Sequence, residues 1–595
     1  MVLSNLSPQT LYEAIVRGCH ALIAAREQLN KINIFPVADG DTGDNLASTA
    51  NAILNYANPK PSFNEMLNSV ADASVLGARG NSGIIFSQFF NGLANNASDK
   101  ENMSVNDFSS ILTHAARRVR ESIATPINGT ILTMIEALAN AFNTHSDDKS
   151  CFTSMRDKLL PLLKDALHTT TDAISVLKQA NVVDAGALGF YFFVEGFTNF
   201  LSNTPSVPPL QTTEIIPQTE HHSTSNTPPE FRYCTEAILR ADNLDKSQLA
   251  ALIEKHGDSL AFTGNDRVCR FHIHTNEPWH VFTPLLAQGT VEHPKVDDMQ
   301  RQFEVSHQRK HTIALVTDSS ADIPHQLKDD YQLHLIPINV HLDEHTLLDR
   351  YCFEPTAFYH NLKSLKNHPK TSLPTPKLIE DKLAYLSQHY EHVLVISVAK
   401  AISGTHNVFA QTAEKHHNIH VIDSRTNSGA QGLLVHYAGE LINAGLPFKS
   451  IIEHVEAATA ETSLLVMVND LDALIRSGRV NKIAGKIGKF SGLKPIISID
   501  KTGKASFLTQ AFNANNALSK IIDITLEQLR TSNKELASYC IIHAGAKEEA
   551  RAFAELTTQA FGKPPAYIEE VSTAIGLHAG QGCVALATRM MDLAQ

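Results

Sequence analysis

The chain has 595 residues, of which 43% are hydrophobic and 19% are charged. This length exceeds what one hydrophobic core supports and predicts roughly three or four domains of about 150 residues each. The composition excludes a wholly disordered chain, a collagen-like fibre and a disulfide-dense secreted scaffold. With 50 Lys and Arg against 62 Asp and Glu, the net charge of −12 argues against nucleic acid as the main partner.

Targeting signals and membrane segments are not evident in the sequence. The densest apolar run, Ala187–Phe197, is interrupted by Glu195 and falls short of the ~18 residues that a membrane helix needs. The first residues lack the basic and apolar regions of a signal peptide. The seven cysteines are scattered and never form a CxxC pair, which disfavours a disulfide framework. We therefore expect a cytoplasmic protein without an integral membrane segment.

A segment rich in Pro, Ser and Thr divides the chain at residues 203–230 and predicts an exposed linker. Before it, residues 1–202 show helical periodicity almost throughout. Ser7 followed by Pro8 is an N-cap and first-turn signal, and the apolar stripe that follows continues as far as Leu29. Residues 1–202 are therefore predicted to form an all-helical domain.

Strand patterns appear only after the linker. Phe231–Ala241 and Arg267–Thr275 are typical of strands and Lys246–Lys255 of a helix, which predicts a small α/β domain over residues 231–308. From residue 309 to 595 buried strands alternate with helical segments. Such alternation predicts a mostly parallel sheet, with ligands bound where the strands end.

The sharpest motif is NIFPVADGDTGDN, residues 33–45. It places Asp39 and Asp41 in a glycine-broken loop, with a helix expected from about Asp44. Two close carboxylates repel each other unless a cation lies between them, and hard oxygen ligands suit Mg²⁺. An EF-hand is excluded, because Gly and Ala occupy the positions of its third and last ligands. A solvated Asx-type turn is the alternative that the motif alone leaves open.

Two glycine-rich loops follow at predicted helix starts. GARGNSG, Gly77–Gly83, could offer backbone N–H groups and the Ser82 hydroxyl to a phosphate. VDAGALG places Asp184 and Gly186 at a second junction. Neither loop matches a P-loop or a kinase glycine loop, and either one alone is more often a packing feature.

Together these motifs resemble the ATP-binding subunit of dihydroxyacetone kinases, the DhaL-like domain, and more closely its variant in bacterial fatty acid kinases. A further element, PINGTIL over Pro126–Leu132, completes the pattern, which covers residues 1–202. The resemblance implies an eight-helix barrel that binds ATP through Mg²⁺ held by Asp39 and Asp41. Where the dihydroxyacetone kinase form has a third Asp, Asn33 is the candidate here. The nucleotide-binding residues implied are Asn45, Asn81, Ser82, Gly83, Thr130, Asp184 and Gly186.

The strand Arg267–Thr275 carries a candidate metal site. Because side chains alternate along a strand, His272 and His274 share one face while Cys269 lies on the other. Cys234 could add a thiolate to the two imidazoles, a donor set that suits Zn²⁺. Ordinary histidines on a half-exposed strand are the alternative. The segment resembles the middle domain of the fatty acid kinase ATP-binding subunit, which favours Zn²⁺ but leaves its role, structural or near the phosphoryl transfer, open.

Polar loops lie between the predicted strands and helices of the C-terminal region. Each loop alone has a simpler interpretation as a turn or a helix cap. They are TDSSADIP (317–324), KTSLPTP (370–376), AISGTHN (401–407), VIDSRTNSGAQG (421–432), LIRSGRV (474–480) and IGLHAGQG (575–582). A carboxylate head group buried with its apolar tail would need such hydroxyls and cations. As a set they resemble the DegV family, whose members bind fatty acids. The resemblance implies that Thr371, Ser372, Ser403 and Thr405 surround the carboxylate, with His578 nearby and Arg479 in a catalytic role.

The resemblances combine into one expectation. The chain would be a multidomain protein with an all-α DhaL-like eight-helix barrel, a small α/β middle domain and a two-lobed α/β DegV-like domain. Its activity would be ATP-dependent phosphorylation of a fatty acid to acyl phosphate. A dihydroxyacetone-type kinase and a lipid-binding protein that only senses nucleotide are the alternatives. A separate DegV-like carrier, an acyl-acceptor protein and a second copy in a homodimer are further candidate partners that the sequence leaves open.

Overall fold

The computed structural model describes residues 3–35, 40–123, 125–147, 150–204, 228–362, 365, 367–469, 471–476 and 493–593. The predicted site residues Asp39 and Arg479, and most of the predicted linker 203–230, lie outside these residues. The chain forms two compact units, Met1–Phe303 and Glu304–Gln595, and each is described by itself. No helix in the described part of the chain is long and apolar enough to cross a membrane.

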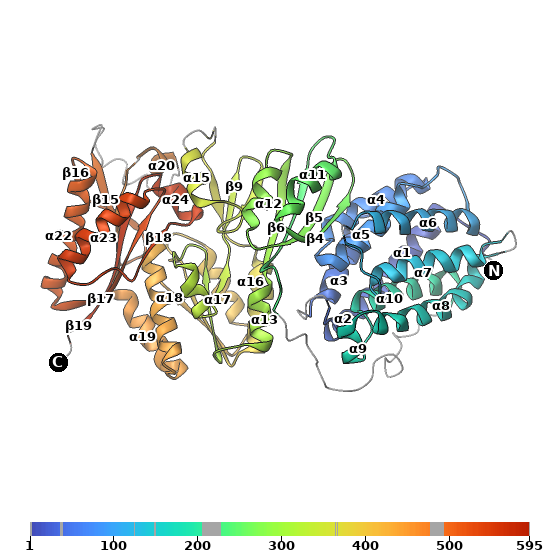
Figure 1. The fold of residues 1–595 in the computed structure, drawn as a ribbon, viewed down its shortest axis with the longest axis horizontal. Coiled ribbons are helices and arrows are strands. Elements are labelled where there is room, and N and C mark those ends of the chain that lie inside the picture. Colours follow the sequence, from blue (N-terminus) through green and yellow to red (C-terminus); the bar gives the residue numbers. More distant parts are fainter. Residues whose placement is uncertain are drawn as a thin grey trace. The chain divides into compact units, whose positions relative to one another are not determined.

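Eight long helices form the N-terminal part of the first unit (Figure 1). They are α1 (Pro8–Ala24), α3 (Thr42–Tyr56), α4 (Phe63–Gly77), α5 (Gly80–Ala94), α6 (Val105–Glu121), α7 (Ile131–His145), α8 (Phe152–Ala173) and α10 (Ala185–Leu201). Each packs against the next in this order, and α10 closes the ring against α1. The predicted eight-helix barrel is thereby confirmed. Two short helices, α2 (Arg26–Lys31) and α9 (Ser175–Ala180), and a strand pair, β1 (Asn5–Leu6) with β2 (Met103–Ser104), accompany it.

The first helix begins where the sequence predicts. The Ser7 side chain accepts the N–H of Thr10 at 3.1 Å, and Pro8 occupies the first helical position. The helix ends sooner than expected, because the chain turns at Ala25, and Leu29 lies on α2 rather than on the same helix. Leu29 nevertheless reaches the same core. Edge-to-face phenylalanine rings from α5 and α10 fill the centre of this core, which makes α10 the most buried helix of the barrel.

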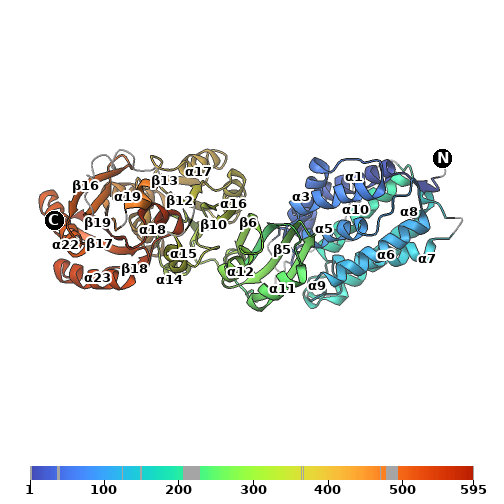
Figure 2. The same cartoon turned by 90° about the horizontal axis from the view of Figure 1, so that it is seen from above.

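A four-stranded antiparallel sheet completes the first unit, in the order β4-β5-β3-β6. Figure 2 labels its strands β5 and β6. Its elements are β3 (Tyr233–Arg240), α11 (Lys246–Ile253), a 3-10 turn (Glu254–His256), β4 (Gly257–Gly264), β5 (Val268–Thr275), α12 (Pro278–Leu285) and β6 (Thr290–Asp298). Strand β4 packs on α5, where Thr263 donates to the Ser87 hydroxyl at 3.0 Å and accepts from Asn91 at 3.2 Å. The barrel and the sheet therefore share a hydrogen-bonded interface. Helix α13 (Met299–His307) follows β6.

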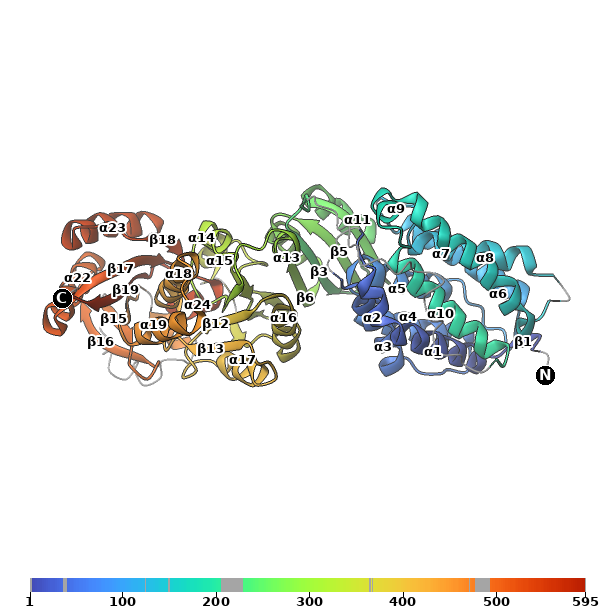
Figure 3. The same cartoon turned by 90° about the horizontal axis from the view of Figure 1, so that it is seen from below.

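The second unit contains two larger sheets with helices (Figure 3). The first sheet, in the order β13-β12-β7-β8, is parallel, and it is followed by a three-stranded sheet, β10-β9-β11. The elements of this part are β7 (Ile313–Asp318), α14 (His325–Asp330), β8 (His334–Ile336), β9 (Asn339–Leu342), β10 (His345–Leu348), α15 (Pro355–Asn361), β11 (Lys370–Ser372), α16 (Pro376–His389), β12 (His392–Ser397), α17 (Thr405–Ala413), β13 (Ile419–Asp423), α18 (Ser428–Asn443) and α19 (Phe448–Ala460).

The last sheet has six strands in the order β16-β15-β14-β19-β17-β18. Its elements are β14 (Thr462–Met467), α20 (Leu471–Arg476), β15 (Lys494–Ile499), β16 (Ala505–Ala511), α22 (Ala514–Ser532), β17 (Lys534–His543), α23 (Lys547–Phe561), β18 (Tyr567–Glu570), α24 (Thr573–Ala579) and β19 (Val584–Asp592). Among the strand pairs of the described residues in this sheet, β17–β18 alone is parallel, so the expectation of a mostly parallel sheet is wrong here. The reason is a tight hairpin between β15 and β16, together with the final strand, which inserts between β14 and β17.

Candidate functional site

A cavity in the first unit is lined from both the helical barrel and the sheet. The helical side supplies Asn33, Asp41, Thr42, Asn45, Gly80, Asn81 and Ser82, and the other side supplies Cys234, His272, His274, Lys295, Asp297, Met299 and Gln302. Residues predicted separately for a nucleotide site and for a metal site therefore border the same space.

Two asparagines hold the residues at the start of α3. The Asn33 side-chain oxygen accepts the N–H groups of Asp41 at 3.0 Å and Thr42 at 2.8 Å. Asn45, one turn into the helix, donates to the Asp41 carboxylate at 2.7 Å. Helix α3 starts at Thr42, slightly before the predicted position, because Asp41 already stands at its N-cap. Asn33, the candidate for a third metal-binding carboxylate, thus already serves as an acceptor for the backbone of the Asp41 loop.

The glycine-rich loop lies directly against Asn45. Gly80 has a φ of +56°, and a Cβ atom there would lie 2.5 Å from the Asn45 side-chain nitrogen. Asn81 and Ser82 follow at the start of α5 and line the cavity. Gly83 lies behind them, where a Cβ atom would meet the Asn45 carbonyl at 3.0 Å. The close packing of the two segments explains why glycine stands at these positions.

Asp184 occupies the N-cap of α10 and accepts the N–H of Ala187 at 2.7 Å. Burial raises the pKa of its carboxyl to about 7, although the N–H groups of Ala187, Ile131 and Gly186 favour the charged form. Ile131 follows Thr130, the N-cap of α7. The N-termini of two helices therefore converge on one buried carboxyl group.

The Asp184 junction adjoins the glycine-rich loop. A Cβ atom at Gly186 would lie 3.1 Å from the Ser82 hydroxyl oxygen and 3.2 Å from the Asp184 carboxylate. All four loops singled out in the helical region are thus brought together. Asn45, Asn81 and Ser82 line the cavity, whereas Gly83, Thr130, Asp184 and Gly186 are not among its lining residues.

The three predicted metal ligands also meet, and together they are called the Cys234 cluster below. One donor atom from each of Cys234, His272 and His274 lies within 4.8 Å of the others. The Nε2 atoms of the two histidines are 3.1 Å apart, close to the roughly 3.3 Å between two nitrogens on a tetrahedral Zn²⁺. All three residues are buried, and burial lowers the pKa of His272, which favours the neutral imidazole that binds metals.

Two carboxylates orient the histidine rings. Glu236 stands opposite His272 in the β3–β5 pair, with its carboxylate 2.9 Å from Nδ1, and Asp258 stands opposite His274 at 3.1 Å from Nδ1. When each Nδ1 carries the proton shared with its carboxylate, both Nε2 atoms present lone pairs to each other. A metal ion or a proton between the two nitrogens would relieve the repulsion of these lone pairs. The donor set and its orientation therefore fit a bound metal ion.

Glu236 connects this cluster to the glycine-rich loop. Its carboxylate accepts the N–H of Gly80 at 2.6 Å and pairs with Arg270 at 3.1 Å in addition to His272. Although burial opposes the charged form, the His272 hydrogen bond and the Arg270 charge hold the pKa of Glu236 below its usual range. Sequence reasoning missed Glu236 and Asp258. Only the antiparallel register of the folded sheet, which the sequence does not display, places each opposite a candidate ligand.

The residues predicted for a lipid carboxylate lie on neighbouring loops of the second unit. Ser372, next to Thr371 on β11, lies 2.8 Å from the ring of His341 on β9. The hydroxyls of Ser403 and Thr405 are 2.9 Å apart at the start of α17. The two loops approach each other, because a Cβ atom at Gly404 would meet Leu373, and α24, which carries His578, packs near β9.

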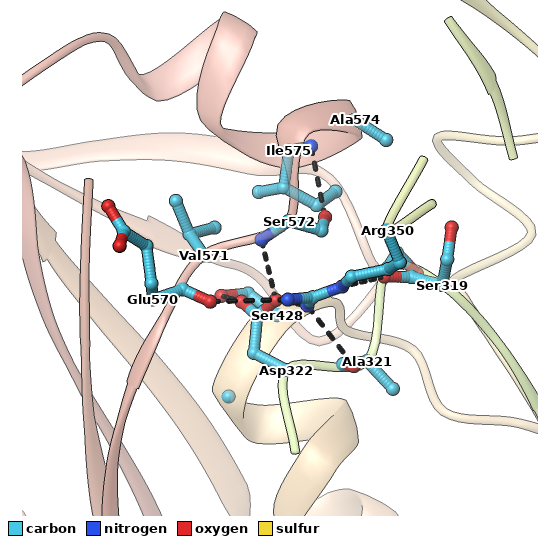
Figure 4. A network of polar contacts seen from close by, with 12 residues as sticks. Ser319, Ala321, Asp322, Arg350, Ser428, Glu570, Val571, Ser572, Ala574 and Ile575 are labelled. Atoms are coloured by element: carbon cyan, nitrogen blue, oxygen red, sulfur yellow. Dashed lines mark hydrogen bonds and ion pairs between the residues drawn. The ribbon is translucent and has the colours of Figure 1, made fainter. Parts of the chain in front are cut away.

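The TDSSADIP motif has a different role from the one expected of a ligand loop. Its Asp322 is fully buried and pairs with the guanidinium of Arg350 (Figure 4). The Ser428 hydroxyl at 2.5 Å and the Ser572 N–H at 2.8 Å also donate to Asp322. Arg350 donates further to the carbonyls of Ser319, Ala321 and Glu570 at 3.3, 3.5 and 3.3 Å. These contacts bring four distant segments of the chain together.

Three family models match the chain in succession. The DAK2 domain matches residues 36–199, the FakA-like middle domain of fatty acid kinase matches residues 230–306, and the DegV family matches residues 312–590. Protein YloV of Bacillus subtilis is 28% identical over 315 residues, which make up 51% of this chain and 57% of that protein. The chain thus spans little more than half the length of this relative.

The C-terminal half has relatives that it covers almost completely. A solved DegV fatty acid binding protein from Bacillus subtilis is 27% identical, with 47% of this chain and all of that one covered and a TM-score of 0.43. A DegV domain-containing protein of Clostridium perfringens, CPE2509, is 30% identical over 278 residues, which are 46% of this chain and 97% of that protein. The chain belongs to the DegV family, and it carries a DAK2 domain and a FakA-like middle domain in the same polypeptide.

Proposed function

We propose that the chain is a cytoplasmic fatty acid kinase that transfers the terminal phosphoryl group of ATP to a fatty acid carboxylate. Residues 1–202 would bind ATP and Mg²⁺, residues 231–308 would complete the site, and residues 309–595 would hold the lipid, with residues 203–230 as the linker. The observation that carries this proposal is the shared cavity, where Asp41, Asn45 and Ser82 face the Cys234 cluster.

The reaction needs no general base. A fatty carboxylate, with a pKa near that of side-chain carboxyls at about 4, is ionised at pH 7. One of its oxygens forms a bond to the γ-phosphorus while the bond from that phosphorus to the β–γ bridging oxygen breaks, which gives acyl phosphate and ADP. Catalysis then rests on charge neutralisation and in-line positioning. Arg479 is proposed to assist at this step.

On the helical side, Asp39 and Asp41 would hold Mg²⁺, which would neutralise the phosphate charge. Asn45 holds Asp41 through the 2.7 Å hydrogen bond and so fixes one ligand. The N–H groups and side chains of Asn81, Ser82 and Gly83 at the start of α5 would contact the phosphates, since a helix N-terminus favours anions. Thr130, Asp184 and Gly186 do not line the cavity and would support the Asn81–Gly83 segment on its other side.

On the sheet side, Cys234, His272 and His274 would bind Zn²⁺. The carboxylates of Glu236 and Asp258 would fix the histidine tautomers. Because the cluster borders the cavity, this ion would lie beside the bound nucleotide rather than at a remote structural site.

In the second unit, the hydroxyls of Thr371, Ser372, Ser403 and Thr405 would donate to the lipid carboxylate, and His578 would lie nearby. A carboxylate taken from water must keep its hydrogen bonds, because an unpaired buried charge costs several kcal/mol. A separate lipid carrier, an acyl-acceptor protein or a second copy of the chain would be the candidate protein partners.

The full chain incubated with ATP, Mg²⁺ and mixed fatty acids should form acyl phosphate, which hydroxylamine traps as the hydroxamate. Asp41→Asn should abolish product while fatty acid remains bound. The matched control is Asp165→Asn, an exposed position on α8 outside the cavity lining. ATP turnover by Asp41→Asn at the wild-type rate would contradict the proposal. Nucleotide binding without any hydroxamate would instead favour a lipid-binding protein that senses nucleotide.

A further inference from the structure

Lys295 stands out among the residues around the cavity. Among the described residues that line it, Lys295 is the one lysine or arginine, while Asp41 and Asp297 supply carboxylates. Phosphoryl transfer develops negative charge that kinases commonly neutralise with a cationic side chain in addition to the metal. The helical barrel contributes no such group to the described lining of this cavity. The sheet contributes one, Lys295 on β6.

A β-bulge aims Lys295 at the cavity. In the β3–β6 pair, Glu292 stands opposite Ile238, whereas Lys295 stands opposite Glu236, so β6 contains one extra residue between these pairs. His293, within the bulge, has a φ of +49°, which is uncommon for a residue other than glycine. A one-residue shift moves every following side chain to the opposite face of a strand. The bulge therefore puts Lys295 and Asp297 on the face that carries Glu236 and the metal cluster.

Asp297 holds the lysine in place. Its carboxylate lies 2.6 Å from the Lys295 ammonium group, and both side chains are about three-quarters buried. Burial disfavours the charged form, but Asp297, Glu236 and Asp41 together raise the pKa of Lys295 above its usual value. An ammonium group has three donors, and one pairing with Asp297 leaves others to contact a ligand. The lysine is thus charged, oriented and directed into the cavity.

We propose that Lys295 contacts the terminal phosphoryl group of the bound nucleotide and neutralises its charge during transfer, with Asp297 as its positioning residue. The inference rests on the proposed function, because it assumes that ATP occupies the cavity. It adds a catalytic residue from the sheet. It also explains why the nucleotide-binding barrel is packed against this sheet: the barrel's described cavity wall lacks a cation.

The test compares two nucleotides that differ at the position Lys295 would contact. Binding of ADP and of a non-hydrolysable ATP analogue to the full chain would be measured by titration calorimetry with Mg²⁺ present. Lys295→Met should lower the affinity for the analogue by at least about tenfold, the scale of a charged hydrogen bond. The affinity for ADP should stay within about twofold of the wild-type value. Lys295→Arg should restore part of the preference. Lys255→Met, an exposed lysine elsewhere on the sheet domain, is the matched control and should bind both like wild type.

Three results would overturn the inference. If Lys295→Met lowers the affinities for ADP and for the analogue equally, or leaves both unchanged, the lysine does not contact the terminal phosphoryl group. If the variant loses bound metal relative to wild type, its effect comes from the Cys234 cluster. If wild type binds neither nucleotide, the proposed function fails as well, an outcome distinguishable from the first two, in which wild-type binding is intact.

Discussion

Two buried polar clusters, one in each unit, contrast in how their charges are satisfied. In the second unit Asp322 and Arg350 are surrounded by protein partners: a hydroxyl, a main-chain N–H and three carbonyls. In the first unit the Asp41, Cys234 and Lys295 side chains border a cavity. Acidic and basic side chains thus occur together once in a closed network and once around a cavity.

This contrast distinguishes charged residues that stabilise the fold from charged residues that can bind a ligand. A closed network contributes to one specific packing arrangement, and removing a partner is costly because a charge is left unpaired. Charges that border a cavity can also be reached by a molecule that is not part of the chain. A variant among the residues around the cavity of the first unit should therefore change ligand binding. A variant in the Asp322–Arg350 network of the second unit should change stability. The following predictions test that division, from the largest expected effect to the smallest.

Arg350→Met should be the most damaging change. It leaves Asp322 buried without its cation, so we expect the free energy of unfolding of the second unit to fall by about 3–5 kcal/mol. Urea unfolding followed by hydrogen exchange of peptides from β7 and β18 would measure it. The control Arg551→Met removes an exposed pair with Glu548 and should cost less than about 0.5 kcal/mol. Equal losses in the two variants, or an altered nucleotide affinity in Arg350→Met, would contradict the division.

Asp184→Asn should remove a pH-dependent contribution to the stability of the first unit. The folded-state pKa of Asp184, about 7, lies above the ordinary value of about 3.9. The stability gained from binding its proton is therefore complete below pH 4 and is lost as the pH rises through 7. Between pH 5 and pH 8, wild type should lose about 2–3 kcal/mol relative to Asp184→Asn in urea unfolding followed by circular dichroism. The exposed control Asp165→Asn should leave this dependence unchanged. A constant difference between wild type and Asp184→Asn would refute the prediction.

Glu236→Gln should lower the metal affinity of the Cys234 cluster. The neutral amide no longer holds His272 as the carboxylate does, and loss of such a partner typically lowers metal affinity 10–100-fold. Competition against a chromophoric zinc chelator would measure the change. Glu292→Gln, on β6 and paired with Arg240, is the matched control and should bind zinc like wild type. Unchanged zinc affinity in Glu236→Gln would show that the carboxylate serves packing alone.

Gly80→Ala should have the smallest effect. The left-handed conformation costs an alanine about 1 kcal/mol, and the new methyl group would displace the Asn45 side chain. We expect nucleotide affinity to fall about fivefold, a change of about 1 kcal/mol. Gly445→Ala, where φ is +73° and the space is open, carries the same backbone cost and should leave nucleotide binding unchanged. A similar loss of affinity in both variants would show that the Asn45 contact is irrelevant.

Much of the arrangement could be predicted from the sequence where local rules decide. Ser7 and Pro8 mark the start of α1, and strand alternation places His272 and His274 on one face. The order of the motifs and their resemblance to the DhaL-like domain also grouped the loops that meet at Ser82 and Asp184. These features depend on a few neighbouring residues, which a sequence displays directly.

Features set by long-range register could not be predicted. The role of Lys295 depends on which strand lies beside β3 and on a single extra residue near His293, and neither is visible as a pattern. The TDSSADIP segment was expected to be one of the loops around a lipid carboxylate, because its hydroxyls suit such a head group. Its partner Arg350 comes from a separate segment and has a φ of +71°, so only the folded structure reveals the closed network.

The two-sided cavity has a consequence for synthesis of the protein. Asn33 to Ser82 leave the ribosome early, but Lys295, Asp297 and Gln302 emerge roughly 200 residues later. At ~5–20 residues per second, this delay is on the order of 10–40 s. The helices that complete the barrel, up to α10, emerge within this interval, and until β6 follows the barrel has only one wall of the cavity. A partly translated chain would thus hold an incomplete pocket, and phosphoryl chemistry would begin only after the sheet has been made and has docked.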